Sequence, residues 1–298
     1  MKAQRIRTQL YQPVVKWVGG KRNLCKELHR KAPPKFGNYY EPFFGGGAFA
    51  LHLHGDGSLS TSNVFLGDMS KPLMTMYYII RDNPQEFIAK LDSEEYSWKM
   101  DISEREVAFI RCRIRFNELN NKPSLENSEE IEMSCLFLYL NKTGFNGLYR
   151  VNKQGHYNVS VDKLTKGART ICDANAVENL SAFLNREGVS LGNCSYETLL
   201  QTAKAGDFVY LDPPYDDTFV AYQKTGFSWD DQVRLKTVVD ELHDRGCYIM
   251  VSNSATAAIK ELYKEYSQDF TSVTSSVNSK ASDRKNKRQE IIIRNYLY

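Results

Sequence analysis

The chain has 298 residues, of which 42% are hydrophobic and 25% are charged, and its formal net charge is +3 at pH 7. This length allows one large domain or two modest ones, and the composition provides enough apolar side chains for a sizeable core. No apolar run approaches the ~20 residues of a membrane span, and the basic N-terminus lacks the apolar stretch of a signal peptide. We therefore expect a cytoplasmic protein, whose mild positive charge permits a polyanionic partner without requiring one.

The cysteines and histidines give no sign of a metal or disulfide framework. The six cysteines are scattered, with no C-x-x-C spacing, which indicates reduced thiols. His52 and His54 are the closest histidines, and two residues apart on a predicted helix they would point to different sides. We predict no metal site.

The first informative stretch is the basic, glycine-containing segment Lys16–Arg22. Gly19 and Gly20 let a backbone pass close to a ligand, and a helix is predicted to begin near Lys21, where a lysine beside a helix start suits an anion. Trp17 could stack on a flat ring. Taken alone, a Gly-Gly turn with solvated lysines is the better reading.

A short aromatic strand at Tyr39–Glu41 runs into three glycines, Gly45–Gly47, and then into a helix from Ala48 to about His54. This is the strand–turn–helix unit of a nucleotide-binding fold, although neither G-x-G-x-x-G nor a P-loop motif is present. A second strand ends in Asp68, at the spacing where such folds place a carboxylate on ribose hydroxyls. The alternatives are a glycine hinge and an aspartate that caps the next helix, Ser70 to about Arg81.

The region from Asn83 to about Leu140 is helical in pattern and highly charged, which indicates an inserted helical region. The stretch from Asn141 to Asn158 then combines Asn, Lys and Arg with aromatics, and a hairpin is predicted around Lys153–Gly155. Such side chains suit readout of base edges and wedging between bases. A solvated hairpin with ordinary turn residues explains the same pattern.

The most unusual motif follows a buried strand at Asp207–Leu211: the tetrad Asp212-Pro213-Pro214-Tyr215. The prolines must end the strand, which places an acid and an aromatic ring at its carboxyl end, where ligands bind in open α/β sheets. A fixed carboxylate and a backbone carbonyl can accept both N–H protons of an exocyclic amine, and Tyr215 could stack on a flipped base. The alternative is a proline-terminated strand with a surface tyrosine.

The remaining predicted elements complete an α/β domain. They are helices at 173–187 and 195–204, a strand at 188–193, a helix from Ser228 to about Arg245 with Ser228 as N-cap, a strand at 247–252, a helix at 256–266, and closing strands at 270–273 and 291–296. Phe219 and Tyr222 fall in a polar loop. A basic loop at 275–289 carries Lys280, Arg284, Lys285, Lys287 and Arg288, and could contact phosphates.

Taken together, the motifs resemble the Dam-type DNA adenine-N6 methyltransferases (D12 class, GATC-type). The resemblance rests on Lys16–Lys21, Glu41–Ala48, Asp68, Phe145–Arg150 and Asp212–Tyr215, which occur in the family's order over nearly the whole chain. The segments Phe227–Leu235 and Val251–Ser254 are also similar to the family. It implies a Rossmann-like S-adenosylmethionine-dependent methyltransferase core at residues 1–82 and 171–298. It also implies a mainly helical target-recognition domain at residues 83–170 that carries the β-hairpin.

The implied activity is that of a site-specific adenine methyltransferase (EC 2.1.1.72). S-adenosyl-L-methionine would donate a methyl group to N6 of an adenine in double-stranded DNA, within GATC, after the base flips into the tetrad. The implied partner is DNA, in the nucleoid, with no membrane and no obligate protein partner, and the protein would be a monomer. Whether it is solitary, paired with a restriction enzyme or phage-encoded stays open.

The implied site residues follow the matching motifs. The catalytic residues are Asp212, Pro213, Pro214 and Tyr215. The cofactor-binding residues are Trp17, Lys21, Glu41, Pro42, Phe43, Gly45, Gly47, Asp68, Asn193, Cys194 and Asp212. The DNA-binding residues are Lys16, Phe145, Asn146, Leu148, Arg150 and Asn152, with Phe145 as the intercalating side chain and Arg150 at guanine.

Three other readings remain. The tetrad also serves other planar amines, so the substrate could be RNA, a protein glutamine or cytosine N4. A DNA-binding module that has lost catalysis would keep the fold, although the intact Asp212, Tyr215, Lys21 and Asp68 argue against it. A nucleotide-dependent oxidoreductase is disfavoured by the absence of G-x-G-x-x-G.

Overall fold

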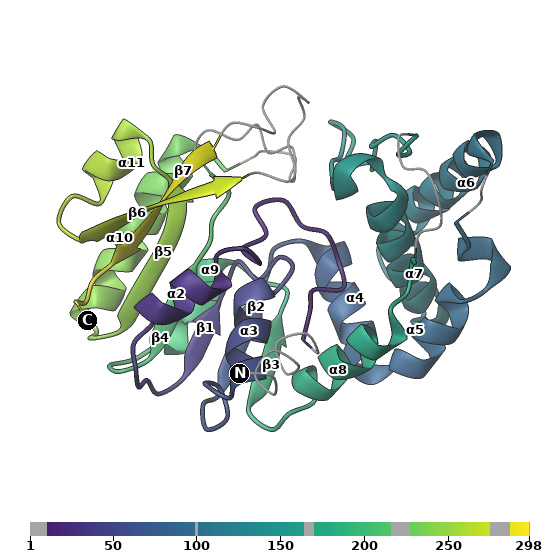
Figure 1. Cartoon of the computed structure of the whole chain (residues 1–298). Coiled ribbons are helices and arrows are strands. Elements are labelled where there is room, and N and C mark those ends of the chain that lie inside the picture. Colours follow the sequence, from purple (N-terminus) through teal and green to yellow (C-terminus); the bar gives the residue numbers. More distant parts are fainter. Residues whose placement is uncertain (1–10, 99–100, 164–169, 216–226, 275–286, 298) are drawn as a thin grey trace. The chain divides into compact units, whose positions relative to one another are not determined.

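The computed structural model describes residues 11–98, 101–163, 170–215, 227–274 and 287–297 (Figure 1). The chain divides into two compact units, which we describe separately. One unit draws on Lys21–Met69, Glu187–Val220 and Thr225–Tyr298 and contains the sheet; the other draws on Met1–Gly20 and Ser70–Arg186 and is mainly helical.

The sheet unit is built on seven strands in the order β3-β2-β1-β4-β5-β7-β6. The strands are β1 (Tyr39–Glu41), β2 (Val64–Gly67), β3 (Val189–Gly192), β4 (Phe208–Leu211), β5 (Tyr248–Ser254), β6 (Ser267–Thr274) and β7 (Lys287–Arg294). Strands β1 to β5 are parallel, while β7 lies antiparallel between β5 and β6. The chain steps outward from β1 to β3 and then returns to start β4 on the other side of β1. The carboxyl ends of β1 and β4 therefore form the switch point at which open sheets bind ligands.

Both faces of the sheet are covered, which explains why β4 reads as an unbroken apolar run. On one face Val209, Ile249 and Ile293 belong to a buried cluster with residues of α10 (Trp229–Asp244) and α11 (Ala257–Leu262). The short helices α9 (Tyr196–Leu199) and η3 (Leu200–Thr202) complete that layer. Their residues Tyr196 and Leu200 are part of the same cluster.

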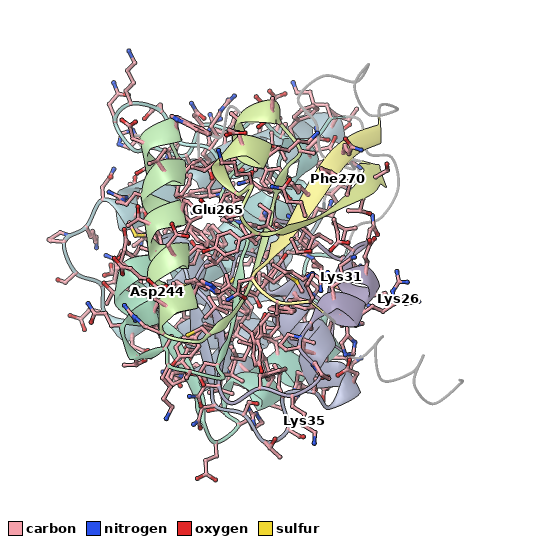
Figure 2. The ribbon with its side chains drawn as sticks, turned by 90° about the vertical axis from the view of Figure 1, so that its left-hand side faces the viewer. Lys26, Lys31, Lys35, Asp244, Glu265 and Phe270 are labelled. Carbon is pink, nitrogen blue, oxygen red and sulfur yellow. The ribbon has the colours of Figure 1, made fainter. Side chains whose placement is uncertain are left out.

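Two helices cover the other face: α2 (Cys25–Lys31) and α3 (Ala48–Asp56). Phe49 of α3 packs edge-on against Tyr39 and Tyr210, with ring centroids 6.4 and 4.7 Å apart. Helix α2 is tied to the edge strand β6, because Lys31 forms an ion pair of 2.9 Å with Asp269. Figure 2 labels Lys31 on α2 and Phe270 on the edge strand β6.

The helical unit contains α4 (Lys71–Asp82), α5 (Pro84–Leu91), η1 (Glu94–Tyr96), α6 (Ile102–Asn120), α7 (Asn127–Thr143), η2 (Phe145–Gly147) and α8 (Ala174–Leu184). Helix α7 is its centre, since it contacts α4, α5 and α6 and is buried almost without interruption from Ile131 to Asn141. A helix that is apolar all round is expected at the centre of a bundle. The stretch from Ile131 to Leu140 therefore belongs to the core of the helical unit.

Most predicted elements are confirmed, with boundaries shifted by a few residues. The helix expected near Lys21 begins only at Cys25, because Lys21 to Leu24 form a turn closed by a 2.7 Å bond from the Leu24 N–H to the Lys21 carbonyl. The helical unit includes the predicted insert at 83–170 and also α4 and α8. The role of residues 83–170 as a recognition domain stays a prediction.

Parts of the predicted polar loops lie outside the described residues. These are the N-terminal arm as far as residue 10, Phe219 and Tyr222, and Lys280, Arg284 and Lys285; the side chains of Lys287 and Arg288 are also outside them. Within the described ranges, no helix is both long and apolar enough to cross a membrane.

Candidate active site

Asp212 leaves the carboxyl end of β4 and meets a buried lysine. The Nζ atom of Lys21 lies 2.7 Å from Oδ1 and 2.8 Å from Oδ2 of Asp212, and the Lys21 side chain is only 4% exposed. A buried ammonium needs an anionic partner, and a carboxylate held on both oxygens keeps one orientation. The pair thus fixes Asp212 at the switch point of the sheet.

Tyr215 lies over the same lysine. Its ring centroid is 4.6 Å from Nζ of Lys21, and its hydroxyl donates a 2.9 Å hydrogen bond to Oε2 of Glu290 on β7. The cation holds the face of the ring while the carboxylate holds its edge. The aromatic plane predicted to stack on a base is therefore anchored from two elements.

The Pro-Pro segment is also pinned from outside the motif. Gln232 of α10 donates a 2.9 Å hydrogen bond to the Pro214 carbonyl, and Asn253 of β5 donates to the Gln232 side chain at 3.1 Å. Gln232 and Asn253 are fully buried. The Pro214 carbonyl is thus engaged within the protein. That the Pro213 carbonyl accepts from the substrate amine stays a prediction.

Burial changes the acidity of two carboxyl groups beside this lysine. The pKa of Asp212 is raised to about 6, chiefly by burial and also by the negative charge of Glu290, against the opposing effect of Lys21. Glu41, at the end of β1, has its pKa raised to about 8, chiefly by burial. Its Oε2 atom accepts hydrogen bonds from the Tyr39 hydroxyl at 2.7 Å and the Ala50 amide at 3.1 Å.

The glycine turn after β1 bonds to the end of β2. The Phe44 amide donates to the Gly67 carbonyl at 2.8 Å, and the Gly45 amide donates to Oδ2 of Asp68 at 2.9 Å. Asn193, just after β3, donates to the Asp68 carbonyl at 2.8 Å. Asp68 therefore faces the glycine turn, and the alternative that it caps the next helix is wrong, because the N-cap of α4 is Ser70.

Three further predicted cofactor residues surround this turn. Pro42 is buried. Phe43 stacks on Tyr196 with ring centroids 5.3 Å apart, so it belongs partly to the core. Cys194 is half-buried against Gly192, where an added Cβ would lie 3.0 Å from its Sγ atom.

Trp17 and Lys16 belong to the helical unit. The indole of Trp17 stacks on Tyr149, with ring centroids 6.1 Å apart and planes 20° apart. Lys16 is exposed, and its backbone is held by Asn141, which accepts from the Lys16 amide at 2.8 Å and donates to its carbonyl at 2.7 Å. The structure thus groups Trp17 with the aromatic side chains of its own unit, and its predicted role at the cofactor stays a prediction.

The predicted hairpin is present. Val151 and Tyr157 form an antiparallel bridge, and the Asn152 side chain closes the turn by accepting from the amides of Gln154 and His156, both at 3.0 Å. Arg150 is exposed and its Nε donates to Oδ1 of Asn158 at 2.8 Å. Asn152 is therefore a turn-forming residue first, while the Arg150 guanidinium is held in place on the surface.

The residues before the hairpin form a tight turn, η2. Asn146 has φ of 57°, a left-handed conformation that asparagine tolerates. Gly147 lies against Lys16, so closely that an added Cβ would come within 2.7 Å of the lysine Cβ. Phe145 and Leu148 are half-buried. Lys16 and the predicted DNA-contacting turn are thus neighbours.

Comparison with known proteins decides the family. The model for the D12 class of N6 adenine-specific DNA methyltransferases matches residues 17–278. The chain belongs to this family.

Relatives match along almost their whole length. The Type II methyltransferase M1.LlaDCHI of Lactococcus lactis subsp. cremoris is 31% identical, covering 96% of this chain and 95% of that protein. The Type II methyltransferase M.MjaIII of Methanocaldococcus jannaschii is also 31% identical, covering 96% and 99% respectively. The DNA adenine methylase of Escherichia coli (strain K12) is 28% identical over 91% of both chains.

This D12-class methyltransferase uses S-adenosyl-L-methionine as its methyl donor. The donor set at the ends of the strands fits such a molecule. The ammonium group of Lys21 suits the carboxylate of the donor, and the carboxylate of Asp68 suits its ribose hydroxyls. Gly45 and Gly47 have φ of 49° and 69°. The three glycines 45–47 carry no side chains, so a ligand can approach the backbone there closely.

Two residues that support the tetrad had no predicted role. Glu290 holds the Tyr215 hydroxyl from 75 residues further along the chain. It sits beside a basic loop in the sequence, where it does not stand out. Gln232 holds the Pro214 carbonyl from 18 residues further along the chain. It lies in the segment Phe227–Leu235, whose resemblance to the family could have drawn attention to it.

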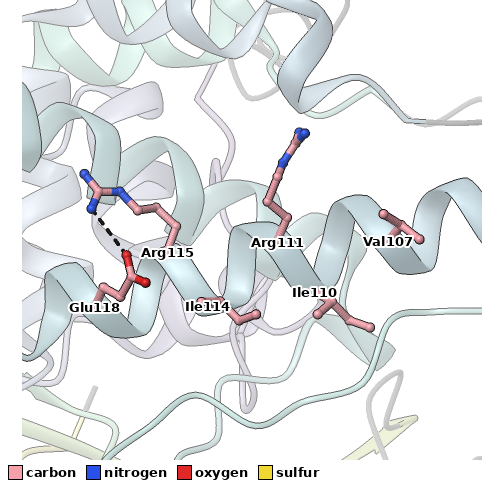
Figure 3. A pocket seen from close by; sticks show the side chains of 6 residues that line it. All are labelled: Val107, Ile110, Arg111, Ile114, Arg115 and Glu118. Carbon is pink, nitrogen blue, oxygen red and sulfur yellow. Dashed lines mark hydrogen bonds and ion pairs between the residues drawn. The ribbon is translucent and has the colours of Figure 1, made fainter.

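A separate hollow of about 490 Å³ runs along α6 in the helical unit (Figure 3). It is lined by Val107, Ile110 and Ile114, with Arg111, Arg115 and Glu118 at its sides. Arg115 is paired with Glu118 at 3.4 Å. An open apolar stripe without a carboxylate–aromatic pair lacks the chemistry for methyl transfer to an amine.

Proposed function

We propose that this methyltransferase acts on adenine in double-stranded DNA within GATC, and that the adenine leaves the helix to enter the site formed by Asp212 to Tyr215. The observation that carries the proposal is the double contact of Lys21 with Asp212 beneath the Tyr215 ring. It provides a fixed hydrogen-bond acceptor and a fixed aromatic plane at one place. Both are needed to hold a planar base with an amino group.

Asp212 and the Pro213 carbonyl would accept the two N–H protons of the adenine amine. A carboxylate offers about four acceptor positions, so Asp212 can serve Lys21 and the amine together. Accepting these protons draws the nitrogen lone pair away from conjugation with the ring, which makes N6 a better nucleophile. S-adenosyl-L-methionine, when bound, supplies an activated methyl group. The proton lost from N6 passes to Asp212 or to water once N6 carries the methyl group.

Tyr215 would position the base by stacking, with Glu290 and Lys21 holding its ring. For the donor, Lys21 would bind the carboxylate, Asp68 would bind the ribose, and the turn at Gly45–Gly47 would hold the methionine part. Trp17, Glu41, Pro42, Phe43, Asn193 and Cys194 would complete that pocket.

Target recognition is assigned to residues 83–170. Arg150 would read guanine, because an arginine held at a fixed angle can pair with O6 and N7 together. Its bond to Asn158 provides that fixed angle. Phe145 would wedge between bases, and Asn146 and Leu148 would touch base edges. Asn152 would shape the turn. Lys16, which lies beside Gly147, would contact the phosphate backbone of the DNA.

The test of the catalytic assignment is a set of four variants: Asp212→Ala, Asp212→Asn, Tyr215→Phe and Tyr215→Ala. We expect both Asp212 variants to lose methyl transfer, since each removes the carboxylate. Tyr215→Phe keeps the ring and should retain more activity than Tyr215→Ala, which should lose ~10- to 100-fold because base stacking contributes about 1–3 kcal/mol. Single-turnover rates with labelled donor measure this order.

DNA binding by the same variants is the control, because none of them touches the predicted recognition segment. Near-normal transfer by Asp212→Ala, with DNA binding intact, would overturn the catalytic assignment.

A further inference from the structure

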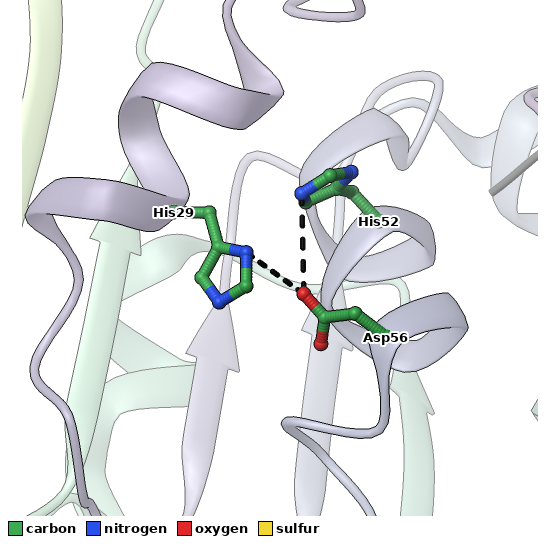
Figure 4. A group of neighbouring side chains, drawn as sticks. All are labelled: His29, His52 and Asp56. Atoms are coloured by element: carbon green, nitrogen blue, oxygen red, sulfur yellow. Dashed lines mark ion pairs between the residues drawn. The ribbon is translucent and has the colours of Figure 1, made fainter. Parts of the chain in front are cut away.

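Two histidines and an aspartate from α2 and α3, none of them assigned to methyl transfer, converge in one group (Figure 4). Nδ1 of His29 lies 2.8 Å from Oδ2 of Asp56, and Nε2 of His52 lies 4.0 Å from the same oxygen. The two imidazole rings meet edge to face, with centroids 5.3 Å apart. His52 and Asp56 are four residues apart on α3, so they share one side of that helix, and His29 reaches them from α2.

The two oxygens of Asp56 have different surroundings. Oδ1 accepts from the Ser58 amide at 2.9 Å and from the Ser58 hydroxyl at 2.6 Å. Oδ2 is buried, and within the described chain its polar neighbours are the two imidazole nitrogens. A buried carboxylate oxygen that faces imidazole nitrogens requires either a proton on one of them or a cation among them.

We propose that His29, His52 and Asp56 form a binding site for a divalent transition metal of the Zn²⁺ type. One possible ligand atom from each residue lies within 4.8 Å of the other two. The proposed ligand atoms are Oδ2 of Asp56 and the two imidazole nitrogens that face it, Nδ1 of His29 and Nε2 of His52. Zn²⁺ bonds of about 2.0–2.2 Å to nitrogen and oxygen place tetrahedral ligand atoms ~3.4 Å apart. Small side-chain rotations would therefore suffice to bind the ion. The distance of 2.8 Å between Nδ1 of His29 and Oδ2 of Asp56 would increase, and the longest distance among the three ligand atoms would decrease.

The accessibility of the three side chains suits a three-ligand site. His52 and Asp56 are 14% and 9% exposed, which fixes two ligands, whereas His29 is 38% exposed and leaves a side open to water. A fourth position taken by water completes tetrahedral coordination. Mixed imidazole and carboxylate ligands favour Zn²⁺, Co²⁺ or Ni²⁺ over Mg²⁺ or Ca²⁺.

A metal here would join α2 and α3, the two helices of the sheet unit next to Lys21. Lys21 precedes α2, and Cys25 in the first turn of α2 donates to the Lys21 carbonyl at 3.3 Å and to the Ala48 carbonyl of α3 at 3.4 Å. A metal bound by His29, His52 and Asp56 would add a second link between α2 and α3, nearer the C-terminal ends of both helices. Its expected effect is on stability rather than on the chemistry of transfer.

The sequence prediction of no metal site considered His52 with His54, which lie two residues apart. His29 lies 23 positions before His52 and comes beside it only because α2 packs on α3. The proposal therefore depends on the fold and not on a sequence spacing.

The test uses the full-length protein, stripped with a chelator and titrated with Co²⁺ alone. We expect one equivalent to bind with the visible absorption of four-coordinate Co²⁺ bound by nitrogen and oxygen, and Zn²⁺ to displace it and raise the melting temperature. His29→Gln and His52→Gln should each bind more than ~10-fold more weakly. His54→Gln, on the same helix but outside the cluster, is the matched control and should bind like the parent.

Imidazole ¹⁵N NMR of the unmodified protein avoids any folding defect of the variants, because Zn²⁺ should shift the ring signals of His29 and His52 alone. A thiolate absorption band in the near ultraviolet, unchanged binding in both variants, or no stoichiometric binding would each overturn the proposal.

Discussion

Asp212 is a buried carboxylate whose pKa is raised, so its protonation should be visible in the pH dependence of the proposed reaction. The pKa of Asp212 is raised to about 6, first by burial and then by the charge of Glu290, while Lys21 opposes the rise. Transfer needs the ionised carboxylate as acceptor, so kcat/KM should fall as the pH drops below about 6. Glu290→Gln removes a negative charge that raises the pKa of Asp212, so that pKa should fall. The acidic limb of the plot of kcat/KM against pH should therefore move to lower pH.

The glutamine in Glu290→Gln keeps an oxygen that can accept from the Tyr215 hydroxyl, so the ring stays placed and the change is mainly electrostatic. The pH dependence of kcat/KM on a DNA duplex, from pH 5 to 8, measures the limb in both proteins. An acidic limb that stays in place, or that moves to higher pH, contradicts the role of Glu290 in setting the acidity of Asp212.

Glu41, whose pKa is also raised by burial, predicts a pH dependence of the free energy of unfolding. Burial raises its pKa from the ordinary value of 4.5 to about 8, although the Tyr39 hydroxyl and the Ala50 amide stabilise the ionised form. Between these two values the folded protein binds a proton that the unfolded chain has lost. The free energy of unfolding should therefore fall as the pH rises from ~4.5 to ~8, by at most about 1.4 kcal/mol per pH unit.

Glu41→Gln keeps an acceptor oxygen for Tyr39 and Ala50 but cannot ionise. Urea unfolding at pH 5, 6.5 and 8 should show this variant losing less stability with rising pH than the parent. Parallel curves for the two proteins would show that Glu41 ionises normally in the folded state.

At the scale of elements, the turn between β1 and α3 depends on one glycine in particular. Gly47 has φ of 69°, and an added Cβ would lie 2.5 Å from the Phe44 ring. Gly57, at the other end of α3, has φ of 92° with nothing within 4 Å of an added Cβ. Alanine at either site strains the backbone, but only Gly47→Ala must also displace an aromatic ring.

We therefore expect Gly57→Ala to cost about 1 kcal/mol of unfolding free energy and Gly47→Ala ~1–3 kcal/mol more. Gly47→Ala should also weaken binding of S-adenosyl-L-methionine, because its Cβ disturbs the turn that bonds to Asp68. Urea unfolding and calorimetric titration of both variants measure the difference. Equal costs, with unchanged cofactor affinity, would show that the turn tolerates a side chain.

At the scale of the molecule, the sequence predicted what is local and missed what is long-range. The strand before Asp212, the glycine turn, the Ser228 N-cap and the hairpin depend on neighbouring residues, and all are present. The contact of Lys21 with Asp212 joins residues 191 positions apart, which no local pattern can indicate. The roles of Glu290 and Gln232 were missed for the same reason, since only the folded sheet unit brings them to the tetrad.

The predicted division of labour, with catalysis in one compact unit and DNA recognition in the other, involves the whole molecule. The family match spans residues 17–278 and so includes residues from both compact units. The residues proposed to carry the chemistry lie in the sheet unit, whereas the residues predicted to read DNA lie in the helical unit. Activity on a defined sequence therefore requires both.

The most direct test of the account is methylation of plasmid DNA that lacks adenine methylation, with labelled S-adenosyl-L-methionine. Nucleoside analysis then identifies the product, and digestion with GATC-cutting enzymes of opposite methylation sensitivity identifies its position. We predict label in N6-methyladenine together with protection from the enzyme that methylation blocks and cleavage by the enzyme that requires it. Label in N6-methyladenine with unaltered GATC cleavage would contradict the assigned recognition sequence, and an absence of label in DNA would contradict the proposed function itself.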